Sequence, residues 1–259
     1  MRVYVETVGV LAPGLQDWER TKSVLLGKQP FCAAPLAPVA PASLLPAERR
    51  RSSPTVRLAI AAAEQALRGT SAPPHGMAMV FSSLEAAGVI THQICEVLAG
   101  SREVSPTQFH NSVHNAPSGY YSIALKATLA ASSVCRGKWS FAAGLLNAAA
   151  QAVTDKIPVL YVCYDSPLPA PLCDVMPIIE TTAIALVLTP APLPGSMATW
   201  EIALAPGDGE AAWPDWMPAA WHANACARGF TVLGTLADPA CRVASLPLSP
   251  ELDLQVSRC

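Results

Sequence analysis

Two shortages in this sequence, of charge and of long apolar runs, narrow the classes of protein that it can belong to. Only 14% of its 259 residues are charged, 51% are hydrophobic, and the formal net charge is -2. A chain without a basic excess has no electrostatic attraction for nucleic acid or for an anionic membrane surface. The longest apolar run, ALVLTPAPL after Ile184, is too short and too interrupted by proline to cross a bilayer. We therefore expect no nucleic-acid partner and no membrane span.

Motifs of secretion and of nucleotide binding are also missing. The first residues, MRVYVETVGVLAPG, contain neither a sustained apolar region nor a small-residue cleavage site, so we expect no signal peptide. The eight cysteines form no C-x-x-C pair, which in a chain of this length favours reduced thiols and a cytoplasmic location. There is no P-loop and no G-x-G-x-x-G motif, and we expect no cofactor.

The residues that are present alternate between strand and helix patterns over the first two-thirds of the chain. Apolar runs typical of strands cover residues 3–10, 77–81, 129–135, 157–164, 178–188 and 199–204. Helical patterns cover residues 57–67, from about Ala86 to Leu98, 116–128 and 139–153, and the Pro-rich segment 30–46 is expected to be an extended loop. This alternation predicts an α/β fold in a single domain over residues 1–259. Beyond Gly207 the pattern is weaker, and we expect Trp213, Trp216 and Trp221 to pack a short helix onto the sheet.

The strand, turn and helix over residues 129–153 have the shape of a nucleophile elbow. The turn contains no G-x-S-x-G motif, which argues against a serine hydrolase. Cys135 has two interpretations. It is either a thiolate nucleophile whose pKa is lowered by Arg136 or Lys138, or an inward-facing cysteine at the end of a strand. The second is favoured, because Cys135 lies three residues before the expected elbow position and no histidine occurs in an activating motif.

His110 and His114 are four residues apart, a spacing that on a helix would place both on one face, as metal ligands require. No H-E-x-x-H glutamate and no third ligand accompany them, so we expect no metal site. Structural hydrogen bonding by His114 and Asn115 in a loop is the better interpretation. The basic triplet Arg49, Arg50 and Arg51 is either a solvated surface or a docking patch for an acidic carrier protein.

The segment from Val104 to Ala143 resembles the β-ketoacyl synthases of the thiolase superfamily. Ser105-Pro106 fits the S-P element of this family, Asn115 fits its loop asparagine, and Ser118-Gly119 fits the A-G pair that opens a helix. The segments VETVGVLAPGLQDW, RLAIAAAEQAL and MAMVFSSLEAAG, and residues 174–189, are similar to family segments in the same order. The resemblance covers residues 1–205 and leaves 206–259 as a C-terminal extension.

The resemblance implies half of a thiolase-like fold. It implies a mixed, mostly parallel five-stranded sheet with helices on both faces. Such a chain pairs with a partner into a layered αβαβα-type dimer.

The departures from the family imply that this chain is not an enzyme. Counting on from the matched strand, the position of the family's acyl-accepting cysteine falls on Lys138, flanked by Trp139 and Ser140. The second half of the family's enzymes, which supplies two catalytic histidines, has no counterpart, and His222 fits neither histidine motif. A site that has lost its nucleophile and both histidines is expected to have no condensing activity.

Catalytically inactive relatives of this kind are the chain length factors. This sequence resembles most a short branch that occurs with the synthases of bacterial aryl polyene pathways. The resemblance implies a subunit that pairs with an active β-ketoacyl-ACP synthase, as a heterodimer or heterotetramer, and helps to shape its acyl tunnel. An acyl carrier protein would meet the chain through this complex.

The resemblance also implies which residues face the partner. The strand that pairs across the dimer corresponds to Leu129, Ala130, Ala131, Ser132, Ser133, Val134 and Cys135. The loop that reaches the partner's acyl tunnel, Ser82 to Ala86, contributes Ser82, Ser83, Leu84 and Glu85. Two rival hypotheses remain: a stand-alone acyltransferase or thioesterase that uses Cys135, and a homodimeric scaffold without a synthase partner.

Overall fold

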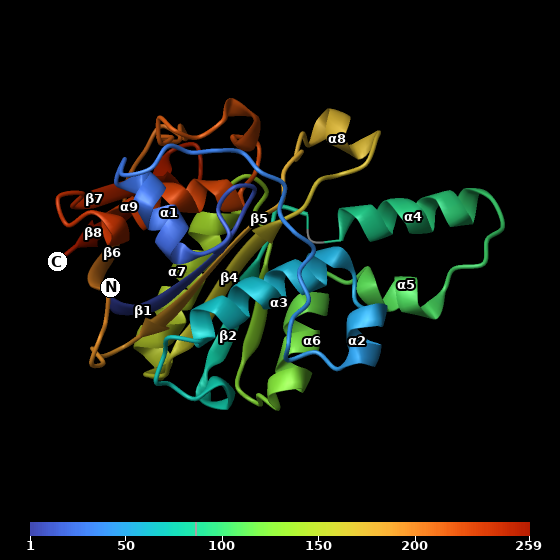
Figure 1. Ribbon diagram of the computed structural model, residues 1–259, viewed down its shortest axis with the longest axis horizontal. Coiled ribbons are helices and arrows are strands. Elements are labelled where there is room, and N and C mark those ends of the chain that lie inside the picture. The colour runs from blue at the N-terminus through green and yellow to red at the C-terminus, as the bar shows by residue number, and fades with distance from the viewer. Residues whose placement is uncertain (86) are drawn as a thin grey trace.

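One eight-stranded mixed sheet runs through the molecule, with helices packed on both of its faces (Figure 1). The computed structural model describes residues 1–85 and 87–259, so Ala86, at the predicted end of the loop and start of a helix, lies outside the described residues. The strand order is β3-β2-β4-β5-β1-β6-β8-β7. The strands are β1 (Arg2–Leu11), β2 (Ala78–Ser82), β3 (Ala131–Val134), β4 (Val159–Asp165), β5 (Thr182–Thr189), β6 (Ala198–Pro206), β7 (Val243–Pro247) and β8 (Leu252–Arg258).

The α/β class and the mixed sheet are confirmed, but the expected number and direction of strands are corrected. Strand β2 pairs in parallel with β3 and β4, whereas β4–β5, β5–β1, β1–β6, β6–β8 and β8–β7 are antiparallel. Parallel neighbours need a long crossover, usually a helix. Only the short helix α8 (Leu172–Val175) lies between β4 and β5, and β5 returns antiparallel to its neighbour. The sheet exceeds five strands because β6 joins it and the C-terminal extension adds β7 and β8.

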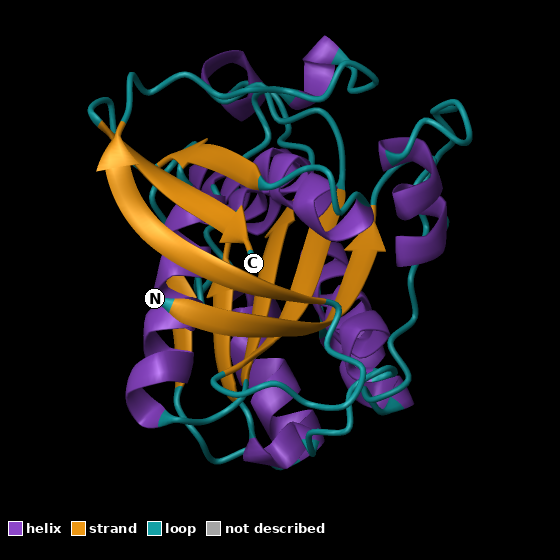
Figure 2. Cartoon of the chain, turned by 90° about the vertical axis from the view of Figure 1, so that its left-hand side faces the viewer, coloured by secondary structure: helices purple, strands orange, loops and turns teal. Residues whose placement is uncertain are grey.

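Two helical layers enclose the sheet, which is strongly twisted when seen from the side (Figure 2). Helices α3 and α6 cover one face, and α1, α7 and α9 cover the other. Strands β2, β4 and β5 are buried along their whole length, as their continuous apolar runs predict for strands covered on both faces. The helices are α1 (Trp18–Leu25), α2 (Pro46–Arg51), α3 (Pro54–Leu67), α4 (Gly88–Ala99), α5 (Pro106–Asn111), α6 (Ala116–Leu125), α7 (Ser140–Asp155), α8 and α9 (Gly229–Ala237), with 3-10 turns η1 (Pro74–Gly76), η2 (Ala219–Trp221) and η3 (Cys226–Arg228).

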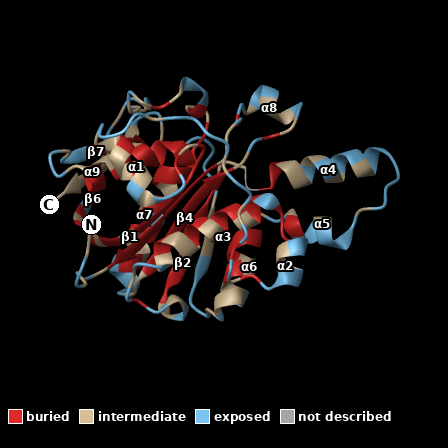
Figure 3. Ribbon diagram, viewed as in Figure 1, coloured by how far each residue is buried: buried red, intermediate tan, exposed pale blue. Residues whose placement is uncertain are grey.

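Helices α4 and α5 form an arm that extends away from the body of the molecule (Figure 1). In α4 only Gly88 is buried, although more than half of its residues are apolar, and Figure 3 shows most of the arm as intermediate or exposed. An apolar helix without a covering layer is typical of a surface that packs against another molecule.

The C-terminal extension is part of the same core. Phe230 and Leu233 of α9 are fully buried beside β1 and β6, and the indole Nε1 of Trp200 in β6 donates to Thr235 Oγ1 at 3.0 Å. The expected tryptophan packing is present at Trp221, which is buried in η2 and meets Trp216 edge-on at 6.2 Å between ring centroids. Among the described residues, no helix is long and apolar enough to span a membrane.

Candidate functional site

The elbow predicted from the sequence is present between β3 and α7. Gly137 adopts a positive φ of 54°, which a glycine accepts without strain. The Arg136 amide donates to Ser140 Oγ at 2.9 Å, and Ser140 Oγ donates to the Gly137 carbonyl at 2.7 Å. Ser140 is buried and closes the turn with its own side chain. The strand, turn and helix are therefore held rigidly, as in an elbow that presents a reactive group.

Lys138 lies at the exposed tip of this turn, immediately before the N-terminus of α7. Its Nζ lies 5.4 Å from the centroid of the Trp139 ring, and Arg136 Cζ lies 5.8 Å from the same centroid. Two cationic side chains therefore flank one indole at the positive end of a helix dipole, which favours anions rather than cations. The turn therefore offers a cationic surface, and the assignment of Lys138 to the family's nucleophile position stays a prediction.

Cys135 is exposed, which corrects the expectation of an inward-facing cysteine. It follows Val134, the last residue of β3 that pairs with β2, and therefore lies beyond the end of the strand. The thiol donates to the Leu84 carbonyl at 3.2 Å. Within the described part of the chain this carbonyl is its hydrogen-bond partner, and no histidine bonds to the thiol. Cys135 therefore lacks the paired base that activates a cysteine nucleophile.

The loop after β2 divides into buried and exposed halves. Ser82 Oγ lies 3.0 Å from the Tyr161 hydroxyl, and Ser83 Oγ donates to Asp165 Oδ1 at 3.1 Å. Both serines are fully buried inside their own chain: Ser82 is paired with Cys163 in the inner strands β2 and β4, and Ser83 is bonded to Asp165. The prediction that their side chains face a partner is therefore corrected. Leu84 and Glu85 keep partial exposure and remain the candidates in this loop.

Strand β3 forms one edge of the sheet, as the sequence prediction of a pairing strand requires. The Met79 amide donates to the Ala130 carbonyl at 2.9 Å, and the Ser83 amide donates to the Val134 carbonyl at 3.3 Å. Backbone groups alternate between the two sides of a strand, so Ala131 and Ser133 direct theirs toward the free edge. Leu129, Ala130 and Ala131 are exposed. The edge is open to pairing, and pairing with a partner stays a prediction.

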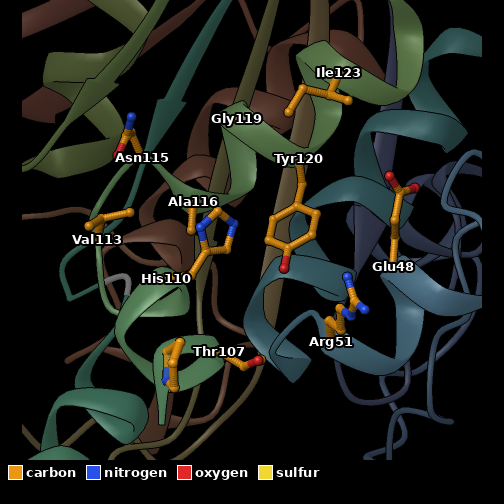
Figure 4. Close-up of a pocket in the computed structure, with 11 residues that line it drawn as sticks. Glu48, Arg51, Thr107, His110, Val113, Asn115, Ala116, Gly119, Tyr120 and Ile123 are labelled. Carbon is orange, nitrogen blue, oxygen red and sulfur yellow. The ribbon is translucent and has the colours of Figure 1, made fainter. Parts of the chain in front are cut away.

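A pocket of about 550 Å³ lies between α2, α5 and α6 (Figure 4). The rings of His110 and Tyr120 meet edge-on at 5.4 Å between centroids, and Figure 4 shows both beside the opening. Helix α6 packs on β3, so the pocket adjoins the open sheet edge. The lining residues are Glu48, Arg51, Pro106, Thr107, His110, Val113, Asn115, Ala116, Gly119, Tyr120 and Ile123.

The exposed apolar residues around this pocket were not singled out from the sequence. The side chain of Ile123 is 72% exposed and that of Phe109 is 67% exposed. A sequence signal existed, because segment 116–125 is apolar on all sides, which is typical of a helix covered on more than one face. In the described chain one of these faces lies open.

The loop between α5 and α6 is held differently from the prediction. His114 Nε2 is buried without a partner among the described residues, and burial lowers the pKa of this histidine against the opposing effect of the Glu85 charge. The Asn115 side chain is exposed and accepts no bond from the described helix α6, whose Ser118 hydroxyl donates to the Asn115 carbonyl instead. Asn111 anchors the loop, because its side-chain Nδ2 donates to the Arg51 carbonyl at 2.9 Å.

No group of three or more His, Cys, Asp or Glu side chains that could bind a metal occurs in residues 1–85 and 87–259. His110 lies against Tyr120 and His114 lies in the loop that follows α5.

Comparison with known proteins matches residues 18–224 to the model of the β-ketoacyl synthase N-terminal domain. A chain of the ketosynthase ApeO in complex with its chain length factor ApeC, from Xenorhabdus doucetiae, is 23% identical with a TM-score of 0.73, and the match covers 100% of both chains.

Two further solved structures are similar. A chain of the ishigamide ketosynthase/chain length factor is 10% identical with a TM-score of 0.69. A chain of AntDE:AntF, a type II acyl-carrier protein in complex with its ketosynthase, is 12% identical with a TM-score of 0.72. Each match covers 100% of this chain and 99% of the other. No curated protein matches the sequence. At these identities the structures show a shared fold, which is the thiolase-like fold that the resemblance implied.

Proposed function

Since this chain belongs to the family of the β-ketoacyl synthase N-terminal domain, we propose that it is a catalytically inactive subunit that pairs with an active β-ketoacyl-ACP synthase. In this role it helps to shape the acyl tunnel of its partner, as a chain length factor does, in polyene or fatty-acid-type biosynthesis. The observation that carries the proposal is an elbow of the right shape with Lys138 at its turn, adjoining a sheet edge that is open to pairing.

The chemistry of the elbow supports the proposed inactivity of the chain. Condensation on a thioester needs a nucleophile that can carry the acyl group, together with groups that activate it. Lys138 is a cation over an indole ring, and the nearby Cys135 thiol donates to a backbone carbonyl. The chemistry is therefore assigned to the partner.

The partner surface combines three features on one side of the molecule. These are the free edge of β3, the arm of α4 and α5, and the pocket between α2, α5 and α6. Phe109 and Ile123 supply the large exposed apolar side chains that an obligate interface buries. The same pairing explains why so apolar a chain keeps these residues at its surface.

The role of Leu84 provides the test of tunnel shaping. Truncating it by Leu84→Ala in the co-expressed complex would enlarge the tunnel, and we expect longer acyl products. Leu84→Trp should shorten them, because a filled tunnel cannot accept two more carbons. The matched control is Leu204→Ala, which truncates a leucine 54% exposed on β6 and should leave the product lengths unchanged. An unchanged product distribution in both Leu84 variants would contradict the tunnel role.

The exposed thiol of Cys135 favours one rival, a stand-alone acyltransferase or thioesterase. Iodoacetamide labelling, resolved by peptide mass spectrometry with and without an acyl thioester, separates the two. Protection of Cys135 by the thioester supports an enzyme, and equal labelling supports the inactive subunit. Co-expression with an active β-ketoacyl-ACP synthase, followed by size-exclusion chromatography, distinguishes the heterodimer from a homodimeric scaffold.

A further inference from the structure

A buried carboxylate lies at the junction of three segments that are distant in the sequence. Asp165 is the last residue of β4, and its side chain is 1% exposed. Oδ1 accepts from Ser83 Oγ at 3.1 Å and from the Leu84 amide at 2.8 Å. Oδ2 accepts from the Cys226 amide at 2.8 Å. One side chain therefore connects the loop after β2 with the C-terminal extension.

The charge of this carboxylate is compensated by hydrogen bonds and not by a cation. In the part of the chain that the structure describes, no Lys, Arg or His forms an ion pair with Asp165. Cys226 begins η3, which leads directly into α9, so Oδ2 caps the positive end of this helical segment. A buried carboxylate is costly unless such donors satisfy it, and the donors to Asp165 come from both segments.

Both backbone polar groups of Leu84, its amide and its carbonyl, are hydrogen-bonded. Its amide donates to Asp165, and its carbonyl accepts the Cys135 thiol at 3.2 Å. The extension is fixed in turn by Asn224, whose Oδ1 accepts from Thr182 Oγ1 at 2.8 Å and whose Nδ2 donates to the Glu180 carbonyl at 3.0 Å. The position of Leu84 is thus set relative to β5 and α9 through Asp165.

We propose that Asp165 is the positioning residue for Leu84. Residues 224–228 of the C-terminal extension supply the contacts on the other side of this carboxylate. The inference rests on the proposed function, in which Leu84 limits the length of the acyl chain. The limit on acyl chain length then depends on the Asp165 carboxylate, which does not itself reach the tunnel. It depends also on residues 224–228, which lie behind the loop.

The test is Asp165→Asn in the co-expressed synthase complex. The amide keeps the shape of the carboxylate but turns a donor toward a backbone N–H, so one of the two segments loses its anchor. We expect amide hydrogen exchange at Leu84 or Cys226 to accelerate roughly ten- to hundredfold, as the loss of a bond to a charged group implies. The product lengths should broaden, while the partner still co-purifies.

The matched control is Glu6→Gln, which makes the same change at another buried carboxylate. Glu6 Oε1 accepts from Thr189 Oγ1 at 3.1 Å and from Ser196 Oγ at 2.5 Å. The two hydroxyls can rotate to suit the amide of the variant. The Glu6 site connects β1 with β5 and with the loop before β6. The control should keep the product lengths of the unmodified complex.

A milder variant keeps the proposal testable if Asp165→Asn does not fold. Ser83→Ala removes one donor to Oδ1 and leaves the carboxylate in place, and it should broaden the product lengths by a smaller amount. Unaltered product lengths in both variants, in a complex where Leu84→Ala does alter them, would overturn the positioning role alone. Unaltered lengths in Leu84→Ala as well would overturn the proposed function.

Discussion

Gly144 lies where helix α7 comes closest to the sheet, and the space beside it admits no side chain. A Cβ built at this position would meet Tyr161 Cε2 at 2.6 Å and Ser82 Oγ at 2.7 Å. These two groups are buried and bonded to each other at 3.0 Å, so neither can move freely. We expect Gly144→Ala to reduce the free energy of unfolding by about 1–3 kcal/mol, the usual cost of overpacking, as measured by urea denaturation.

The matched control is Gly119→Ala in α6, where a Cβ would meet no atom within 4 Å. Alanine is favoured over glycine inside a helix, so this variant should gain about 0.5–1 kcal/mol in the same measurement. Equal destabilisation by the two substitutions would show that the close packing of α7 does not cause the loss of stability in Gly144→Ala.

Single residues of the site were predictable where a local pattern marks them. Lys138 is predicted at the elbow by counting on from the matched family elements, and it does lie at the exposed tip of the turn, while its role stays a prediction. The burial of Ser82 depends on the register of β2 against β4, which no local pattern contains. No local pattern marks Asp165, since its donors at Ser83 and Cys226 are 82 and 61 residues away.

At the scale of elements, the free edge of β3 gives a direct prediction. Ala131 begins this strand and directs its amide away from β2. Ala131→Pro removes that amide and leaves the ladder to β2 intact, because proline is tolerated at the first residue of an edge strand. We expect the variant to keep its unfolding midpoint within a few degrees and to lose co-purification with the synthase.

The opposite edge of the sheet supplies the control for this experiment. Val243 begins β7, the last strand in the order, and is exposed. The Arg258 amide donates to the Arg242 carbonyl, so by alternation the Val243 amide faces outward. The Val243→Pro variant should still co-purify with the synthase. Loss of the partner in Val243→Pro as well would mean that β3 is not the pairing edge.

Elements with strong apolar runs were predictable and the shorter ones were not. Strands β2 and β4 and helices α3 and α7 were expected within a few residues of their bounds. Helices α2 and α5 have six residues each, too few for a helical period to show. Strand β8 did carry a signal, because Leu254 and Val256 alternate with less buried residues, but the resemblance ended before it.

The stability of the whole molecule should depend on pH through Asp165. Burial raises the pKa of this carboxyl to about 6, although the backbone amides of Cys226 and Leu84 oppose the shift. The folded state therefore binds the proton more tightly than the unfolded state, whose pKa is near 3.8. The stability that protonation contributes is fully present below the unfolded pKa and is lost as the pH rises through about 6.

We expect the full chain to gain on the order of 2 kcal/mol in unfolding free energy, relative to Asp165→Asn, when the pH falls from 7.5 to 4.5. Urea denaturation of both proteins at the two pH values measures this difference. Burial raises the pKa of Tyr164 and of Cys226, so these neighbours do not ionise in this window. If the difference in unfolding free energy between the two proteins stays constant with pH, the raised pKa of Asp165 is contradicted.

The central place of β1 in the sheet has a consequence for the way the molecule is made. Val10 pairs with Ile184 of β5, and Arg2 pairs with Glu201 of β6. At a synthesis rate of about 5–20 residues per second, the first strand waits roughly 10 to 40 s for its neighbours to leave the ribosome. Throughout that interval a β-branched, apolar strand has no neighbour in the sheet, and pairings so distant in sequence close slowly. The nascent chain therefore exposes this apolar strand until β5 and β6 have emerged.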